Sequence, residues 1–143
     1  MIDGFEKNGV TLNHEVMPNG EQRFRMYFAD GSAYIRTESS EDGSWQNSHY
    51  HKSICEAYIV QKGCIVFVEQ SLDSEVAQFS ILKEGEACFA KSLIAHNVFL
   101  PRNSVIHTVK YGVIIDKDWN AFEALDKQTK PLSEDELLRL YGR

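Results

Sequence analysis

The sequence has few cysteines, no long hydrophobic stretch and no recognisable export signal, and each absence narrows the class of protein. Its three cysteines form an odd set without a C-x-x-C spacing, so we expect reduced, partly buried thiols. The longest uninterrupted apolar stretch, Cys64 to Val68, is far shorter than a membrane span. The first nine residues lack the apolar core of a secretory signal. We therefore expect a cytoplasmic protein with no membrane partner.

Basic clusters are also missing. The formal net charge is -6, and no basic run or alternating basic and aromatic stripe occurs. Nucleic-acid binding depends on Lys and Arg side chains that neutralise phosphates, so we expect no nucleic-acid partner. Small anionic ligands stay compatible with this composition, because one or two local basic residues suffice for them.

Length and composition fit one globular domain. The chain has 143 residues, of which 43% are hydrophobic and 25% charged. We predict a single domain over residues 1–143, with a barrel core at about 23–116 and a C-terminal helical extension at about 117–143.

Short alternating segments dominate the pattern between residues 23 and 116. The segment 23–29 places Phe24, Met26 and Phe28 on one face, which we expect to be buried. Arg25 and Tyr27 then lie either outside the barrel or in its mouth, and we expect them outside. Asp30-Gly31 is a hairpin turn signal. Further strands are expected at 32–37, 54–61, 64–70, 76–82, 87–90, 97–100, 105–110 and 112–116. Many short strands with Gly-marked turns indicate an all-β sandwich or barrel.

The last segment of the chain has the signals of a helix. Ser133 is a good N-cap residue, Glu136 completes a capping box, and Leu132 can pack on Leu137. Gly142 suits the C-terminal end. We predict a short helix here, and a second one around residues 119–125.

The stretch from Gly43 to Gly63 contains three side chains able to bind a metal. His49 and His51 are two residues apart, so on a strand they point the same way, and Glu56 follows closely. Imidazole and carboxylate together suit Mn, Fe, Co, Ni and Zn. The alternative interpretation is a polar strand end whose histidines meet only solvent.

The spacing Gly43-x5-His49-x-His51-x4-Glu56-x6-Gly63 resembles the first signature of the cupin superfamily. The segment from residue 95 to residue 107 resembles its second signature, with four departures. Ala95 replaces the first Gly, Asn103 replaces the second, His107 lies one residue late, and Tyr111 replaces the final Asn. Asn tolerates a left-handed backbone, and a longer turn or a bulge would absorb the extra residue before His107.

The resemblance implies a cupin-type double-stranded β-helix, or jelly-roll barrel, with a short C-terminal helix. It also implies one divalent transition metal (Mn, Fe, Ni, Co or Zn) held by His49, His51, Glu56 and His107. Such a ligand set leaves up to two positions of an octahedral ion for substrate, water or dioxygen. The alternative is a cupin whose pocket histidines act without metal.

Neighbouring side chains are candidates for other roles. Trp45 and Asn47 have the parity of the histidines, which makes them candidates for substrate binding, although Trp45 equally fits ordinary barrel filling. Tyr58 and Tyr111 are candidate catalytic residues. Tyr58 is expected on the same strand face as Glu56, and Tyr111 on the same strand face as His107. We expect the remaining polar residues near the motifs to face solvent or to be structural, namely Tyr50, Lys52, His96 and Lys110.

Two classes of function fit these residues. The first is a metal-dependent enzyme acting on a small polar metabolite, of the dioxygenase type or the sugar or keto-acid isomerase or epimerase type. The second is a non-catalytic binding or sensing cupin with a structural metal. A metal-free sugar-nucleotide epimerase or isomerase is a third. In each case we expect a small-molecule ligand and a homodimer.

Overall fold

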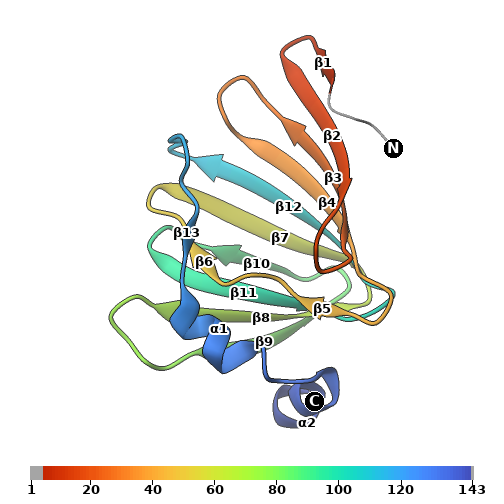
Figure 1. Cartoon of the computed structure of the whole chain (residues 1–143), viewed down its shortest axis with the longest axis vertical. Helices are drawn as coiled ribbons and strands as arrows, with labels where there is room; N and C mark the ends of the chain where they lie inside the picture. Colours follow the sequence, from red (N-terminus) through yellow and green to blue (C-terminus); the bar gives the residue numbers. More distant parts are fainter. Residues whose placement is uncertain (1–4, 143) are drawn as a thin grey trace.

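The computed structural model describes residues 5–142, which form two antiparallel sheets and two short helices (Figure 1). In Figure 1 the strands run from β1 and β2 at one end of the molecule to β8 and β9 at the other, where both helices lie. Residues 1–4 and 143, the ends of the predicted domain, lie outside the described residues. The arrangement confirms the all-β jelly-roll barrel with a short C-terminal helix.

One sheet has seven strands in the order β1-β2-β3-β4-β12-β7-β10, and each neighbouring pair is antiparallel. Its strands are β1 (Phe5–Lys7), β2 (Val10–Val16), β3 (Gln22–Tyr27), β4 (Ala33–Glu38), β12 (Val105–Gly112), β7 (Ile54–Lys62) and β10 (Ala87–Ala90).

The other sheet has the order β13-β6-β11-β8-β9, and β5 also pairs with β11. Its strands are β13 (Asn120–Ala121), β6 (His49–Tyr50), β11 (Ile94–Leu100), β8 (Cys64–Ser71), β9 (Gln78–Lys83) and β5 (Ser44–Trp45). Strands β8 and β11 are buried along most of their length, because one face meets the opposite sheet and the other meets the helices.

Apolar side chains from both sheets fill one part of the barrel interior. They are Tyr58, Val60, Ile65, Phe67, Leu82, Ala90, Val98, Leu100 and Ile106. Alternate residues of a strand share a face, so the inward faces can be followed beyond this core. The inward face of β7 runs from Val60 through Tyr58 to a carboxylate, and that of β11 runs from Leu100 through Val98 to a histidine. Both strands therefore pass from the core into a polar chamber.

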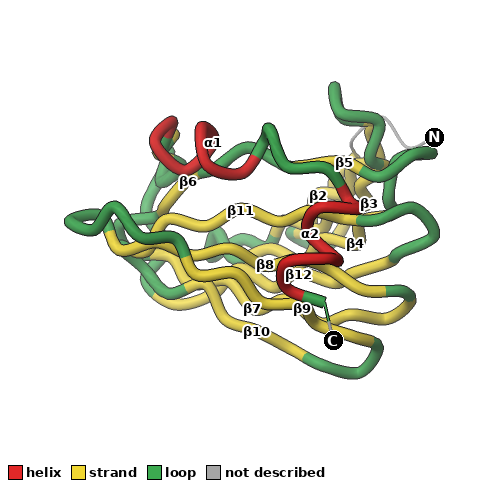
Figure 2. The backbone as a smooth tube through the Cα atoms, turned by 90° about the horizontal axis from the view of Figure 1, so that it is seen from below, coloured by secondary structure: helices red, strands yellow, loops and turns green. Residues whose placement is uncertain are grey.

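Two helices cover the outer face of the six-stranded sheet: α1 (Glu123–Thr129) and α2 (Glu134–Tyr141). Leu125 of α1 and Leu137 of α2 are fully buried against Val66, Val68, Ala95 and Phe99. Figure 2 shows α1 outside the strands next to β6 and β11, and Figure 1 shows α2 beyond β9. The capping box of Ser133 and Glu136 is present as predicted.

Some predicted elements differ from the observed ones. Residues 113–116 form no strand, and the helix expected at 119–125 occupies Glu123–Thr129 instead. The hairpin β1-β2 was not predicted. No helix among the described residues is long and apolar enough to cross a membrane.

Two turns explain residues of the sequence motifs. Gly43 has a φ of +80°, and a Cβ there would lie 3.1 Å from backbone atoms of Leu100, Pro101 and Arg102. Asn103 has a φ of +61°, the left-handed conformation expected of a residue in a glycine position. Of the two alternatives given for the extra residue, a longer turn or a bulge, the structure has a register shift between Val105 and Ile106, as a bulge would produce.

Candidate metal centre and its cavity

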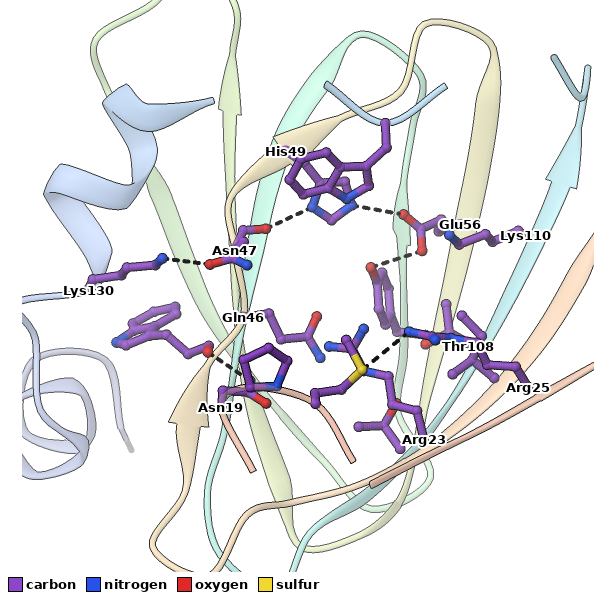
Figure 3. A pocket seen from close by; sticks show the side chains of 17 residues that line it. Asn19, Arg23, Arg25, Gln46, Asn47, His49, Glu56, Thr108, Lys110 and Lys130 are labelled. Atoms are coloured by element: carbon purple, nitrogen blue, oxygen red, sulfur yellow. Dashed lines mark hydrogen bonds and ion pairs between the residues drawn. The ribbon is translucent and has the colours of Figure 1, made fainter. Parts of the chain in front are cut away.

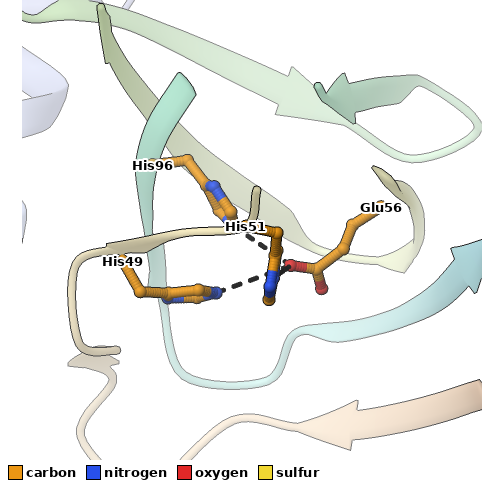
Figure 4. Close-up of side chains that lie close together, drawn as sticks. All are labelled: His49, His51, Glu56 and His96. Atoms are coloured by element: carbon orange, nitrogen blue, oxygen red, sulfur yellow. Dashed lines mark hydrogen bonds and ion pairs between the residues drawn. The ribbon is translucent and has the colours of Figure 1, made fainter. Parts of the chain in front are cut away.

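Four buried side chains from three strands and a loop converge at the polar end of the barrel. His49 lies on β6, His51 in the loop that follows it, Glu56 on β7 and His96 on β11. Their ligand atoms all lie within 4.8 Å of one another. Figure 4 shows the three imidazole rings directed at the glutamate carboxylate. We call this group the histidine–glutamate centre.

All three histidines direct Nε2 at the same oxygen. The distances from Glu56 Oε1 to Nε2 are 2.5 Å for His51, 3.2 Å for His96 and 3.5 Å for His49. His96 is also the strand partner of His49, which places two of the rings side by side. The centre therefore depends on strand pairing rather than on sequence proximity alone.

The other nitrogen of each ring faces a backbone carbonyl, which can only accept a hydrogen bond. Nδ1 of His49 donates to Asn47 O at 2.8 Å, Nδ1 of His96 to Ile94 O at 3.4 Å, and Nδ1 of His51 to Asp118 O. A neutral imidazole with its proton on Nδ1 carries its lone pair on Nε2. Three lone pairs and a carboxylate thus meet at one point, an arrangement that is stable only with a cation or protons between them.

The pKa values of these groups agree with an ionised carboxylate. Burial would raise the pKa of Glu56, but the three histidine side chains that contact its carboxylate outweigh burial and hold that pKa well below its usual value. Burial lowers the pKa of His49. Burial also opposes protonation of His51, but its hydrogen bond to Glu56 and the Glu56 charge outweigh this and raise its pKa. One proton on His51 satisfies one of the three contacts, whereas a cation satisfies all of them.

The donor set fits a borderline divalent metal. Three imidazole nitrogens and one carboxylate oxygen suit Mn, Fe, Co, Ni and Zn. The backbone carbonyls behind the rings are the outer partners that metal-binding histidines commonly have.

The structure corrects the prediction for His107, which does not join this centre. His107 lies on the outer face of β12, where Nδ1 is 2.5 Å from Tyr34 Oη and Nε2 is 2.5 Å from Gln61 Oε1. Its neighbours Ile106 and Thr108 point into the barrel and are buried. A shift of one residue along a strand moves a side chain to the opposite face, so the late position of His107 turns it outward.

His96 takes the fourth position, although the sequence suggested a structural or surface role for it. It is 1% exposed and shares its face of β11 with Val98 and Leu100 of the core. Its parity with these two apolar residues was the signal that could have identified it, because a histidine on a core face needs a polar partner.

Asp118 and Trp119 also contribute, and neither was singled out from the sequence. The Asp118 carboxylate accepts hydrogen bonds from the backbone N–H groups of Lys52, Ser53 and Ile54, at 2.6, 2.9 and 3.1 Å. These bonds outweigh burial and lower the pKa of Asp118. The indole of Trp119 stacks on the His49 ring, with centroids 5.1 Å apart.

A cavity of about 690 Å³ opens beside the centre. Figure 3 shows its lining as a ring of mostly polar side chains, with His49 and Glu56 at one end. Among the predicted site residues, Tyr58, Trp45 and Asn47 also line the cavity. A volume of this size accommodates a small-molecule ligand.

The predicted pocket residues have different roles. Tyr58 donates its hydroxyl to Glu56 Oε2 at 3.2 Å, and burial together with the Glu56 charge raises its pKa well above the usual value. Trp45 donates Nε1–H to Leu132 O at 3.0 Å, and Asn47 accepts a hydrogen bond from Lys130. Tyr111 is 41% exposed on the outer face of β12 and lies outside the cavity lining.

Strand β3 has the predicted alternation with the opposite orientation. Arg23 and Arg25 line the cavity, whereas Phe24 is 38% exposed on the outer face. Tyr27 shares the parity of the two arginines and is 37% exposed. Lys110, expected at the surface, also lines the cavity. The interior face of β3 is therefore basic where apolar residues were expected.

Comparisons with known proteins identify relatives of the fold only. No protein-family model matches the sequence, and no curated protein matches it significantly. Among solved structures, the cupin domain of Drosophila melanogaster CENP-C has a TM-score of 0.57 at 13% identity, over 70% of each chain. The capsular polysaccharide assembling protein CapF from Staphylococcus aureus has a TM-score of 0.59 at 14% identity, over 78% of this chain and 32% of CapF.

Oxalate decarboxylase from Bacillus subtilis has a TM-score of 0.62 at 12% identity, over 92% of this chain and 37% of the decarboxylase. Another structure of the decarboxylase concerns its Mn(II) centres. The chain thus spans about a third of the length of CapF and of the decarboxylase.

Proposed function

We propose, from the cupin fold that this chain has and from the histidine–glutamate centre inside it, that the protein binds one divalent transition metal and is an enzyme acting on a small polar metabolite. The observation that carries the proposal is the convergence of three Nε2 atoms on Glu56 Oε1, each ring being held by a backbone carbonyl. Manganese is the first metal to test, since the similar Bacillus subtilis decarboxylase has Mn(II) centres.

His49, His51, Glu56 and His96 would hold the metal. The bound metal would supply Lewis acidity toward a substrate oxygen, or redox chemistry if it is iron. Redox chemistry suits the first proposed reaction type, a dioxygenase. Lewis acidity suits the second, a sugar or keto-acid isomerase or epimerase.

Other residues of the chain orient these ligands. Tyr58 keeps its proton because its pKa is well above the usual value, so it acts as a hydrogen-bond donor to Glu56 Oε2. This fixes the carboxylate with Oε1 toward the histidines. We therefore assign a positioning role to Tyr58.

Trp119 packs against the His49 ring at the cavity lining and shields it from water on that side.

Two other functions use the same residues. A non-catalytic binding or sensing cupin would bind a ligand in the cavity without turnover. A metal-free epimerase or isomerase would remain active after chelation, with a histidine and a tyrosine as its acid and base. Every ring nitrogen of the histidine–glutamate centre contacts a backbone carbonyl or Glu56. This favours metal binding by these histidines over a role in acid–base catalysis.

Elemental analysis of the protein purified without added metal tests the proposal. We expect close to one equivalent of a transition metal, or its uptake on soaking, and loss of both in Glu56→Gln. A content below about a tenth of an equivalent without uptake would overturn the metal assignment, because a preformed four-ligand site binds tightly. Activity that survives complete chelation would instead support the metal-free alternative.

We also propose that the protein forms a homodimer through the outer face of the seven-stranded sheet. Phe89, Ile59 and Val109 lie on adjacent strands of that face and are 57%, 46% and 41% exposed. Burial of such an apolar surface stabilises association. Elution at the monomer mass across a dilution series would refute the dimer.

A further inference from the structure

One wall of the cavity is basic, although the whole chain carries a formal net charge of -6. Arg23 and Arg25 on β3 and Lys110 on β12 line this wall, and Glu56 is the one acidic residue among the described residues of the lining. Figure 3 shows Lys110 beside Glu56, with Arg25 and then Arg23 farther from Glu56 around the cavity, and Lys130 on the opposite side. An acidic protein that gathers cations around a cavity creates a local potential that attracts anions.

The basic groups differ in how far the protein already neutralises them. Arg23 pairs with the fully buried Glu21 at 2.8 Å, and Arg25 pairs with Glu15, which is partly exposed. The Lys110 side chain has no ion pair or hydrogen bond within residues 5–142. The Nε of Arg23 is buried and also has no partner there. The unpaired Lys110 ammonium therefore faces the cavity, whereas the Arg23 Nε is enclosed by the protein.

Lys110 is placed beside the candidate metal centre. It is the direct strand partner of Glu56 across the β12–β7 pair, and both side chains point inward. Thr108, two residues earlier, lines the same wall. A ligand that reaches the histidine–glutamate centre therefore also lies next to the Lys110 ammonium group.

The opposite side of the cavity is lined by neutral amides. Asn19, Gln46 and Asn47 lie there, and Lys130 is bound to Asn47 Oδ1 at 2.6 Å and to Asp126 at 3.6 Å. Amides recognise hydroxyl and carbonyl oxygens without requiring charge. The cavity thus offers a charged wall for one part of a ligand and a neutral polar wall for another.

We propose that the cavity binds a small oxygen-rich organic anion, with its acidic group, a carboxylate or a phosphate, held by Lys110 and Arg25. The placement of the ligand's other oxygens next to the metal rests on the proposed function. The recognition of the acidic group does not, because Lys110 and Arg25 belong to the protein itself.

Calorimetric titration with simple probes tests the charge requirement. Malonate and inorganic phosphate represent the two acidic groups, and malonamide is a neutral compound of nearly the same shape as malonate. We expect at least one anion to bind metal-loaded protein, and malonamide to bind at least about tenfold more weakly, because charged hydrogen bonds are the stronger ones. Binding of malonate without phosphate would assign the wall to carboxylates, and the reverse to phosphates.

Matched variants locate the binding. Lys110→Met and Arg25→Gln should each weaken anion binding by at least about tenfold. Arg36→Gln, on the outer face of β4, removes a positive charge from the same sheet and should leave binding unchanged. Arg23 is not substituted, because its loss would leave Glu21 buried without its ion pair.

The metal content of every sample keeps this inference separate from the proposed function. If the protein takes up no metal but binds an anion through Lys110 and Arg25, the anion site stands and the metal centre fails. If the protein is fully loaded and neither anion binds at tens of millimolar, the anion site fails alone. Equal binding of malonamide, or unchanged binding in both pocket variants, would also overturn it.

Discussion

Replacing Asp118 by alanine is expected to destabilise the protein and to weaken metal binding together. The Asp118 side chain accepts three backbone N–H groups in the segment between His51 and the start of β7. Its own backbone carbonyl accepts the hydrogen bond of His51 Nδ1. One residue thus fixes both the turn that separates two ligands and the orientation of one of them.

The magnitude follows from the three lost bonds. Hydrogen bonds to a charged group contribute about 1.5–3 kcal/mol each, but water replaces the partner of an exposed donor. Lys52 is exposed, Ser53 is half-buried and Ile54 is buried, so the full cost applies mainly to the Ile54 N–H. We expect a loss of about 2–4 kcal/mol in the free energy of unfolding. Alanine keeps the backbone carbonyl that holds His51, but without the three side-chain bonds that carbonyl is no longer fixed against the ring, which should lower the metal affinity by about 10- to 100-fold.

Urea unfolding of the metal-free protein measures the first effect, and competition with a chromophoric chelator measures the second. Asp30→Ala is the matched control, because Asp30 also accepts a backbone N–H, from Ser32, in an exposed hairpin turn and belongs neither to the histidine–glutamate centre nor to the cavity lining. The control should keep the metal affinity of the wild type. A stable Asp118→Ala variant with unchanged metal affinity would refute the role given to this residue.

The pH dependence provides a second check on Asp118. Its pKa is lowered in the folded protein, so its stabilisation is present above the unfolded pKa and is lost as pH falls through the folded one. The difference in stability between wild type and Asp118→Ala should therefore shrink as the pH falls below about 3.8. A difference that stays constant down to about pH 2 would contradict the sign of this shift.

Three further expectations concern other parts of the site. Gly43→Ala should cost about 1–3 kcal/mol more in unfolding free energy than Gly85→Ala, since both have positive φ but only the Gly43 Cβ would meet backbone at 3.1 Å; equal losses would contradict the close approach. Tyr58→Phe should cost about 1–3 kcal/mol in urea unfolding, because Glu56 loses its hydroxyl donor; an unchanged midpoint would argue against that bond. Metal affinity measured against pH should fall as pH decreases, because the raised pKa of His51 lets the metal-free protein hold a proton there above pH 6.5. The stabilisation of the metal-free protein by that proton should accordingly be lost as pH rises through the raised pKa.

The fold was predictable because its signals are local. Apolar or alternating segments between turn signals located β7, β8, β9 and β10 closely, and the Ser133 capping box located α2. The cupin signature also located His49, His51 and Glu56, whose ligand atoms come together as expected. The face on which a residue lies and the spacing within a motif both depend on residues close together in the sequence. They can therefore be read from the sequence without knowing which strands pair.

The position of the fourth candidate ligand, His96, depends on how strands distant in the sequence pair with one another. The second signature is degraded, and the extra residue before His107 reverses the parity of β12 relative to the pattern. His96 reaches the centre because β11 pairs directly with β6. No local pattern specifies that pairing. The one local signal for His96 is that it shares a strand face with the apolar Val98.

The basic wall was missed for a related reason. Alternation on β3 showed two faces but not which one is interior, and the apolar face was assumed to be buried. In the structure Arg25 and Ile35 are strand partners that both line the cavity. The usual rule is that the apolar face of a strand is the buried one. Around a polar cavity the reverse holds, because polar side chains then point inward.

Metal content of His96→Ala and His107→Ala, measured by elemental analysis beside the wild type, tests the central claim most directly. We expect His96→Ala to lose the bound metal and His107→Ala to retain about one equivalent, because of these two histidines only His96 directs Nε2 at Glu56. Circular dichroism of both variants would establish that each has kept its fold. Retention by His96→Ala together with loss by His107→Ala would contradict the histidine–glutamate centre.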